Sequence, residues 1–352
     1  MDQQEHSDIL MQAVGPEIYR RNAFRVLGLA TDAKAGDISR RLEEIKMLEK
    51  FGGGYRSNGG LAVDVSADPD LLQEAGARLS DPERRLVDEF FWFWPRELGQ
   101  AGADPAIQAL AEGDLRGACK VWLEQEANTG NGHIAGHNLA VMAHVLALDL
   151  EHDGSNGGGN GHPPVALDAY WRHAWSRWRA VLEQEAFWSR VAERIRELDD
   201  PRLTTGTARR MRSALPAALL TINARLAVRH AEQGDLGEVQ KQMRLIQQSG
   251  FAQEVITAIL AKAVAPFVER VQLFTESARQ EAEADPAHAD QPAWRLLEQV
   301  GEPLRIIDLL LPADHPTRHA AHDQPALCAL QCQINYGTKQ PPAESRWVCI
   351  RC

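Results

Sequence analysis

The chain has 352 residues, enough for two or three domains, and 44% of them are hydrophobic and 25% charged. This composition is that of a folded globular protein and excludes wholesale disorder. The net charge of −11 argues against nucleic acid and anionic lipid as partners, because an acidic surface repels phosphate. No apolar stretch reaches the roughly 18–20 residues of a membrane helix. Residues 1–14 lack the pattern of a signal peptide, so we expect a cytoplasmic protein.

Apolar residues recur at helical spacing along most of the chain, which predicts an all-α fold. In residues 38–48, for example, apolar positions three or four apart share one face, and charged residues cover the other. Alternating β-branched runs, which are typical of strands, are nearly absent. Beyond the N-terminal hundred residues, helices are expected over 106–127, 134–151, 165–197, 208–233, 236–249, 251–284 and 291–311.

The composition divides the chain into four segments. Residues 1–15 are polar and are expected to be flexible, and residues 16–96 form a helical module. Residues 103–312 form a second helical region, and residues 313–352 are a short tail rich in Pro, His and Cys. Within the second region, the glycine-rich stretch 153–161 predicts a flexible surface loop. It lacks the Gly-Lys-Ser/Thr continuation that a phosphate-binding loop requires.

Two motifs mark the N-terminal module. The sequence NAFRVLGL over 22–29 predicts a short helix that ends at its glycine, before a Thr-Asp turn and a longer amphipathic helix. The sequence LSDPERR over 79–85 predicts a second helix start, with Ser80 or Asp81 as the cap and Pro82 in the first turn.

These motifs, in this order, resemble the J-domain, the helical module of DnaJ-type co-chaperones. In that family a Tyr/Phe-x-x-Leu-Gly helix leads into a long second helix, and a Leu-Ser-Asp-Pro-x-x-Arg segment closes the domain. The resemblance covers residues 16–96. It implies a J-like fold and a seventy-kilodalton heat-shock-type chaperone as partner. Family members stimulate the ATPase of that chaperone through a His-Pro-Asp turn and basic residues of the second helix.

The sequence departs from the family at that turn. The corresponding place, 49–52, reads Glu-Lys-Phe-Gly, and Asp68-Pro69-Asp70 is better interpreted as the start of a helix. The second helix is not basic either, because its four basic residues are balanced by four acidic ones. We therefore expect a degenerate J-like module that docks a partner without the family's stimulating turn. The candidate docking residues on the second helix are Arg40, Arg41, Lys46 and Lys50.

Five consecutive aromatic residues, 90–94, close the module. Five successive side chains point in different directions on a helix, so we expect some of them to pack inside or against the next helical region. The alternative is an exposed patch that binds a partner. The candidates for that patch are Phe91, Trp92 and Trp94.

Two stretches of the second helical region are similar to tetratricopeptide-type helix pairs. Residues 106–126 and 224–250 each read as helix, Gly-Asp turn and helix, although no period of roughly 34 residues repeats. An irregular helical array or a bundle would present a groove suited to a client protein or peptide. We expect Pro216 and Pro266 to kink or end helices in this region.

Two side-chain clusters in this region have both a chemical and a structural interpretation. Trp171, Trp175 and Trp178 alternate with arginines, which suits stacking on nucleic-acid bases, but we favour a buried helix face. His133 and His137 have the spacing of zinc ligands on a helix, yet no glutamate accompanies them. We interpret both histidines as packing or capping residues.

Two close pairs of cysteines lie in the last 25 residues, separated by 16 residues. Such spacing is typical of zinc-ribbon-like modules, and a reducing compartment favours metal over disulfide. His319 or His322 is an alternative ligand, and unliganded thiols in a mobile tail are the alternative to a metal site. The expected ligands of a structural zinc ion are Cys328, Cys332, Cys349 and Cys352.

The chain shows no Walker loop, no Gly-x-Ser-x-Gly, no His-Glu-x-x-His and no dinucleotide fingerprint. We therefore expect neither an enzyme nor a small-molecule substrate. The first hypothesis is a non-enzymatic, co-chaperone-like adaptor that contacts a heat-shock-type ATPase and holds a client through its helical region. The alternative is a scaffold subunit of a regulatory or defence complex without chaperone activity. The cysteine module contains little basic charge, which argues against nucleic-acid binding through it.

Overall fold

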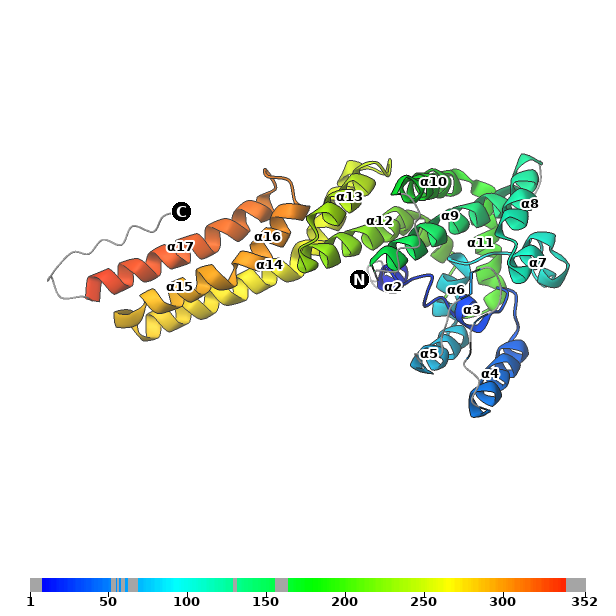
Figure 1. The fold of residues 1–352 in the computed structure, drawn as a ribbon, viewed down its shortest axis with the longest axis horizontal. Coiled ribbons are helices and arrows are strands. Elements are labelled where there is room, and N and C mark those ends of the chain that lie inside the picture. The colour runs from blue at the N-terminus through cyan, green and yellow to red at the C-terminus, as the bar shows by residue number, and fades with distance from the viewer. Residues whose placement is uncertain are drawn as a thin grey trace. The chain divides into compact units, whose positions relative to one another are not determined.

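The computed structural model describes residues 8–51, 55, 57, 61–62, 69–128, 132–155 and 164–339. All regular elements among these residues are helices and none is a strand, which confirms the all-α prediction (Figure 1). The chain divides into two compact units. The first comprises Met1–Asn223 with Leu245–Val255, and the second comprises Ala224–Arg244 with Ile256–Cys352.

The N-terminal module has the helix order that its motifs predict. Asn22 caps the first short helix by accepting hydrogen bonds from the backbone N–H groups of Phe24 and Arg25. Gly28 ends that helix with φ at 64°, a left-handed conformation that glycine adopts at little cost. Asp81 caps the last helix of the module, and Pro82 follows it directly. The helices are α3 (Ala23–Leu27), α4 (Ala35–Lys50), α5 (Pro69–Ser80) and α6 (Pro82–Phe90).

The N-terminal segment is more ordered than expected from residue 8 onward. Residues Asp8–Ala13 form a further helix, α2, which packs against α6. The reason is local, because Leu10 and Val14 belong to a mostly apolar run, 9–14, and are buried. Burying two such apolar side chains stabilises a short segment by a few kcal/mol, about 1.5–3 for each.

Helices α3, α4 and α5 enclose a hydrophobic core of their own. Phe24 and Leu27 of α3 face Ile45 of α4 and Leu79 of α5 across this core, and all four side chains are at most 4% exposed. Leu42 and Trp92 pack at its edge. The module therefore has the interior that its amphipathic pattern predicts.

The rest of the first unit is also helical. The predicted Gly-Asp turn separates α7 from α8, because Gly113 is left-handed with φ at 87° and Asp114 caps α8. The helix expected over 165–197 is broken at Gln184 into α10 and α11. The elements are η1 (Ala101–Ala103), α7 (Pro105–Glu112), α8 (Leu115–Ala127), α9 (Gly132–Ser155), α10 (Pro164–Glu183), α11 (Glu185–Leu198) and α12 (Thr207–Gln233), of which the second unit takes the last ten residues.

The second unit contains the predicted long helix and one helix that the sequence did not predict. Pro266 does not end the predicted long helix, because α14 continues through it, and in the first unit α12 likewise continues through Pro216. The segment from residue 313, expected to be a short zinc-ribbon-like tail, contains the helix α17, which runs through Pro325. The remaining elements are α13 (Leu236–Gln247), α14 (Gln253–Ala284), η2 (Pro286–His288), α15 (Asp290–Gln299), α16 (Gly301–Leu310) and α17 (Pro316–Lys339).

Candidate partner-binding surface

Helix α4 has one buried face and one exposed face. Ile38 and Ile45 are buried in the module core, and Leu42 packs against it. This follows from the helical spacing of the apolar residues, which places all three on one side of the helix. The exposed positions of α4 include three of the four basic candidates, namely Arg40, Lys46 and Lys50.

Large apolar side chains lie among these charges at the C-terminal end of α4. Met47 is 53% exposed, Leu48 is 49% exposed and Phe51, directly after the helix, is 80% exposed. A single exposed apolar residue is ordinary, whereas several within little more than one turn, rimmed by charges, are typical of a protein-binding surface. We call Arg40, Lys46, Met47, Lys50 and Phe51 the α4 surface.

Arg41, the fourth basic candidate, is tied to the module itself. Its guanidinium donates hydrogen bonds to the backbone oxygen of Leu27 at 3.0 Å, to the Tyr55 hydroxyl at 3.2 Å and to Glu44 at 3.1 Å. It also lies over the Tyr55 ring. These contacts hold α4 onto the end of α3, so we assign Arg41 a structural role and leave it out of the α4 surface.

The aromatic run 90–94 mostly faces inward. Phe91 and Trp94 are 0% and 1% exposed, so they do not form the exposed patch that was one interpretation of the sequence. Phe90 stacks on Trp178 of α10 with ring centroids 5.7 Å apart, and Trp94 contacts Phe187 of α11 at 5.9 Å. The run therefore docks the module onto the helices that follow it. This agrees with the first of the two interpretations of the sequence, in which the aromatic residues pack inside or against the next helical region.

Buried polar side chains from α9 hold the backbone of the same run. Asn138 accepts a hydrogen bond from the Trp94 N–H at 2.9 Å and donates one to the Trp94 oxygen at 2.7 Å. His137 Nε2 contacts the Phe90 oxygen at 2.8 Å, and burial of this ring lowers the pKa of His137 to about 4. His137 is thus a neutral packing residue, as expected, and its partners leave it unsuited to bind zinc with His133.

A second buried histidine of α9 lies among the tryptophans of α10. Trp171, Trp175 and Trp178 are at most 2% exposed, which confirms the buried helix face and removes the base-stacking interpretation. His144 Nδ1 accepts the Trp178 indole N–H at 3.2 Å and lies 3.0 Å from the Tyr19 hydroxyl. Burial lowers the pKa of His144 to about 3, so this ring is also neutral at pH 7.

Ion pairs also join the module to the body of the first unit. Glu89 of α6, 1% exposed, accepts hydrogen bonds from Arg85 of the same helix and from Arg194 of α11, each at 2.7 Å. Arg25 of α3, 5% exposed, donates to both carboxylate oxygens of Asp149 on α9. The sequence does not indicate the pairs with Arg194 and Asp149, because their members are separated by more than 100 positions and carry no motif.

Trp92 is the one partly exposed member of the three aromatic candidates. It lies at an apolar pocket between α3 and α7 with a cavity volume of about 170 Å³. A dry cavity of about 150 Å³ accommodates a benzene ring, so this pocket is large enough for one apolar side chain of a bound protein. The lining includes Phe24, Leu29, Trp92, Phe93, Ile107 and Leu110.

Two of the predicted zinc ligands lie in α17, and Cys349 and Cys352 fall outside the described residues. Cys328 and Cys332 are one turn apart on the buried face of the helix, and the Cys328 thiol donates to the Thr275 oxygen of α14 at 3.5 Å. Burial and the neighbouring Cys328 raise the pKa of Cys332 to about 11, so a metal ion would have to displace its proton. Their shared face suits one tetrahedral ion, and structural zinc stays a prediction that metal analysis of the purified chain would decide.

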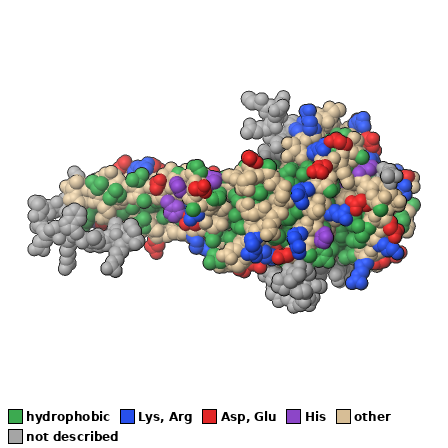
Figure 2. Space-filling model, turned by 90° about the horizontal axis from the view of Figure 1, so that it is seen from above, with side chains coloured by type: hydrophobic (Ala, Val, Ile, Leu, Met, Phe, Trp, Pro, Cys, Tyr) green, Lys and Arg blue, Asp and Glu red, His purple; other side chains and the backbone are tan. Residues whose placement is uncertain are grey.

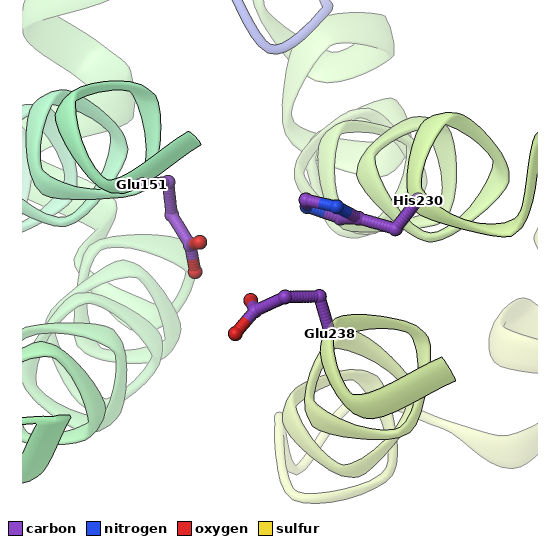
Figure 3. Close-up of side chains that lie close together, drawn as sticks. All are labelled: Glu151, His230 and Glu238. Atoms are coloured by element: carbon purple, nitrogen blue, oxygen red, sulfur yellow. The ribbon is translucent and has the colours of Figure 1, made fainter. Parts of the chain in front are cut away.

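A histidine and a glutamate face each other elsewhere in the second unit. His230 of α12 and Glu238 of α13 have ligand atoms within 4.8 Å of each other (Figure 3). Glu151, drawn in the same view, belongs to the first unit, where it accepts a hydrogen bond from the Trp171 indole at 3.0 Å. Two ligands are fewer than the three or four of a typical protein zinc site, so the pair in the second unit does not define a metal centre.

Comparison with protein-family models, with curated proteins and with solved structures finds no match for this chain. None of the helices in the described part of the chain is long and apolar enough to cross a membrane.

Proposed function

We propose that this chain is a non-enzymatic adaptor whose J-like module binds another protein through the α4 surface. The first candidate partner is a seventy-kilodalton heat-shock-type chaperone. The observation that carries the proposal is the exposure of Met47 and Phe51 among Arg40, Lys46 and Lys50. This surface lies on the second helix of the J-like motif order, the helix whose basic residues contact the chaperone in the family that the sequence resembles.

The N-terminal module is firmly attached to the rest of the first unit, which favours an adaptor over a loosely tethered domain. Buried aromatic rings and the Glu89–Arg194 and Arg25–Asp149 pairs attach the module to α9, α10 and α11. A partner bound to the α4 surface is therefore held in a fixed position relative to the rest of the first unit. The helical region, including the pocket beside Trp92, is the proposed binding site for a client protein.

The missing His-Pro-Asp turn limits what the module does to a chaperone. Positions 49–52 read Glu-Lys-Phe-Gly, so the family's means of stimulating ATP hydrolysis is absent at this place in the sequence. We propose docking without stimulation, so that the chain recruits the chaperone to a client or keeps it from other co-chaperones.

The second candidate is a scaffold subunit of a regulatory or defence complex with no chaperone link. The observation that favours it is the way α6 is incorporated into the core of the first unit through Glu89, Phe90 and Phe91. In this case the J-like module is a structural part of the first unit. The α4 surface then binds a protein other than a heat-shock-type chaperone.

Affinity capture from the native host tests both candidates. Wild-type chain, Met47→Glu and the double variant Lys46→Glu/Lys50→Glu are used as baits, and bound proteins are identified by mass spectrometry. Lys120→Glu on α8 is the matched control, because it reverses an exposed charge on another helix of the same unit.

We expect a heat-shock-type ATPase that binds wild type and Lys120→Glu and is lost from both α4 variants. Recovery of a different protein with the same dependence on α4 would replace the chaperone with the scaffold hypothesis. Equal capture by all four baits would reject the α4 surface as a binding site.

A further inference from the structure

Helix α17 combines a buried face with an exposed face that is also apolar. Cys328, Ala329 and Cys332 are at most 5% exposed and pack inside the second unit. On the opposite side Leu327 is 64% exposed, Leu330 57% and Ile334 49%, and apolar side chains are visible at the surface of this unit (Figure 2). Large apolar side chains that share a helix face are normally buried, and here uncharged polar residues such as Gln331 are the only other side chains among the three.

The same stretch carries no charge. The 15 residues from Gln324 to Thr338 include no side chain that is charged at neutral pH, in a protein of which 25% of the residues are charged. Surface helices keep charged residues because these maintain solubility, and the centre of a protein interface is depleted in charge. The exposed face of α17 thus has the composition of an interface.

We propose that this face binds the same face of a second copy of the chain, with the two α17 helices antiparallel. A net charge of −11 makes two copies repel each other in general, and an uncharged face is where they meet without like charges opposed. A partner that presents charged side chains to this stretch would lose their hydration without gaining an ion pair. The same uncharged stretch of a second copy has no such loss.

The spacing of the exposed residues supports self-pairing. Leu327, Leu330 and Ile334 recur at intervals of three and four, the pattern by which two helices interlock their side chains. A two-fold axis between Leu330 and Gln331 places Leu327 against Ile334 of the other copy, and Ile334 against its Leu327. At the ends of this pairing Asp323 meets Thr338 of the other copy, so no acidic residue opposes another.

The mass of the full-length chain in solution tests the proposal. Sedimentation velocity of the wild type over a range of concentrations is expected to show a shift from the monomer mass of 39.0 kDa to twice that value. Leu327→Glu and Ile334→Lys each place a charge against an apolar residue of the other copy, and each is expected to raise the dimer Kd at least tenfold.

Mixing the two variants tests the antiparallel register. At one end of a mixed dimer, the carboxylate introduced by Leu327→Glu in one copy lies against the ammonium introduced by Ile334→Lys in the other. At the other end, the unchanged Leu327 and Ile334 remain in contact. We therefore expect an equimolar mixture to form dimers more readily than either variant alone. Leu273→Glu on α14, at a position 67% exposed, is the control and should behave like wild type.

Three results would overturn the proposal. The first is a wild-type chain that stays monomeric up to about 100 µM, a concentration at which even a weak specific interface is populated. The second is a dimer that Leu327→Glu and Ile334→Lys leave intact, which places the interface elsewhere. The third is a mixture of the two variants that remains monomeric, which rejects the antiparallel register. Circular dichroism of each variant confirms that the helices are retained.

Discussion

Helices α4 and α17 both leave large apolar side chains in water, and they differ in what surrounds those side chains. Met47 and Phe51 lie among Arg40, Lys46 and Lys50, while Leu327, Leu330 and Ile334 lie in a stretch without any charge. Apolar exposure alone therefore does not define a binding mode. A charged rim gives a surface that selects a different, complementary protein, and an uncharged face suits an identical helix.

The two helices also differ in what supports them. The module that carries α4 is attached to its unit by buried ion pairs and hydrogen-bonded histidines. Helix α17 packs on α15 and α16 with a buried face of small apolar residues and cysteines, and its ion pair between Arg318 and Asp308 is partly exposed. The support of α4 is thus more sensitive to charge and pH than that of α17. This contrast leads to stability predictions for the first unit.

The largest effect is expected from Glu89→Ala. This change leaves Arg85 and Arg194 facing each other in a largely buried site without their carboxylate. Loss of one member of a buried ion pair costs about 3–5 kcal/mol of unfolding free energy. Urea denaturation should show this loss, and capture through the α4 surface should weaken with it.

The matched control is Glu193→Ala on α11. Glu193 pairs with Arg190 at 3.2 Å, and its side chain is 53% exposed, so its removal should cost less than about 1 kcal/mol. Equal losses for both variants would show that burial of Glu89 does not secure the module.

Mild acid should destabilise the first unit through its buried histidines. The folded-state pKa values of His137 and His144, about 4 and about 3, lie below the value of about 6.5 for an unfolded chain. Their contribution is complete above pH 6.5 and is lost as the pH falls towards 4. Each histidine should account for about 2 kcal/mol between pH 7 and pH 5.

The slope of the unfolding free energy against pH separates the contribution of the buried histidines from that of the carboxylates. His144→Phe should reduce the slope between pH 6 and pH 5 by about one proton, which is about 1.4 kcal/mol per pH unit. His288→Phe replaces an exposed histidine and serves as the control for the substitution itself. An unchanged slope in His144→Phe would mean that this ring is not held neutral by burial.

The smallest of these effects concerns the cap of α6. Asp81 accepts hydrogen bonds from the backbone of Glu83 and Arg84, and it also pairs with Arg202. Although burial acts against it, these partners lower the pKa of Asp81. Asp81→Ala should cost about 1 kcal/mol, and Asp81→Asn, which keeps the capping oxygen, should recover most of it. A loss of equal size in both variants would assign the effect to the charge rather than to the cap.

The sequence predicted the parts of the fold that depend on local signals. The cap at Asp81, the glycine stop at Gly28 and the Gly-Asp turn at Gly113 all appear where the motifs place them, because each is determined by a few neighbouring residues. The sequence predicts that Pro216 and Pro266 kink or end helices, and neither of them ends its helix. Both prolines, like Pro325, lie inside helices, where packing of the surrounding turns outweighs the loss of one backbone hydrogen bond.

The candidate site was predicted only in part. Arg40, Lys46 and Lys50 are exposed as expected, because they lie opposite the apolar face of an amphipathic helix. The inward orientation of Phe91 and Trp94, and the pairing of Glu89 with Arg194, depend on helices more than 40 positions away in the chain. Helical periodicity gives the face of one helix but not its tertiary neighbours.

The central claim is that the α4 surface binds a heat-shock-type chaperone, and the most direct test is calorimetric titration of purified full-length chain with that chaperone. The account predicts saturable binding by wild type and by Lys120→Glu, and binding at least tenfold weaker by Met47→Glu. It also predicts no increase in the chaperone's ATP hydrolysis. Absence of binding by the wild type, or equal binding by Met47→Glu, would contradict it.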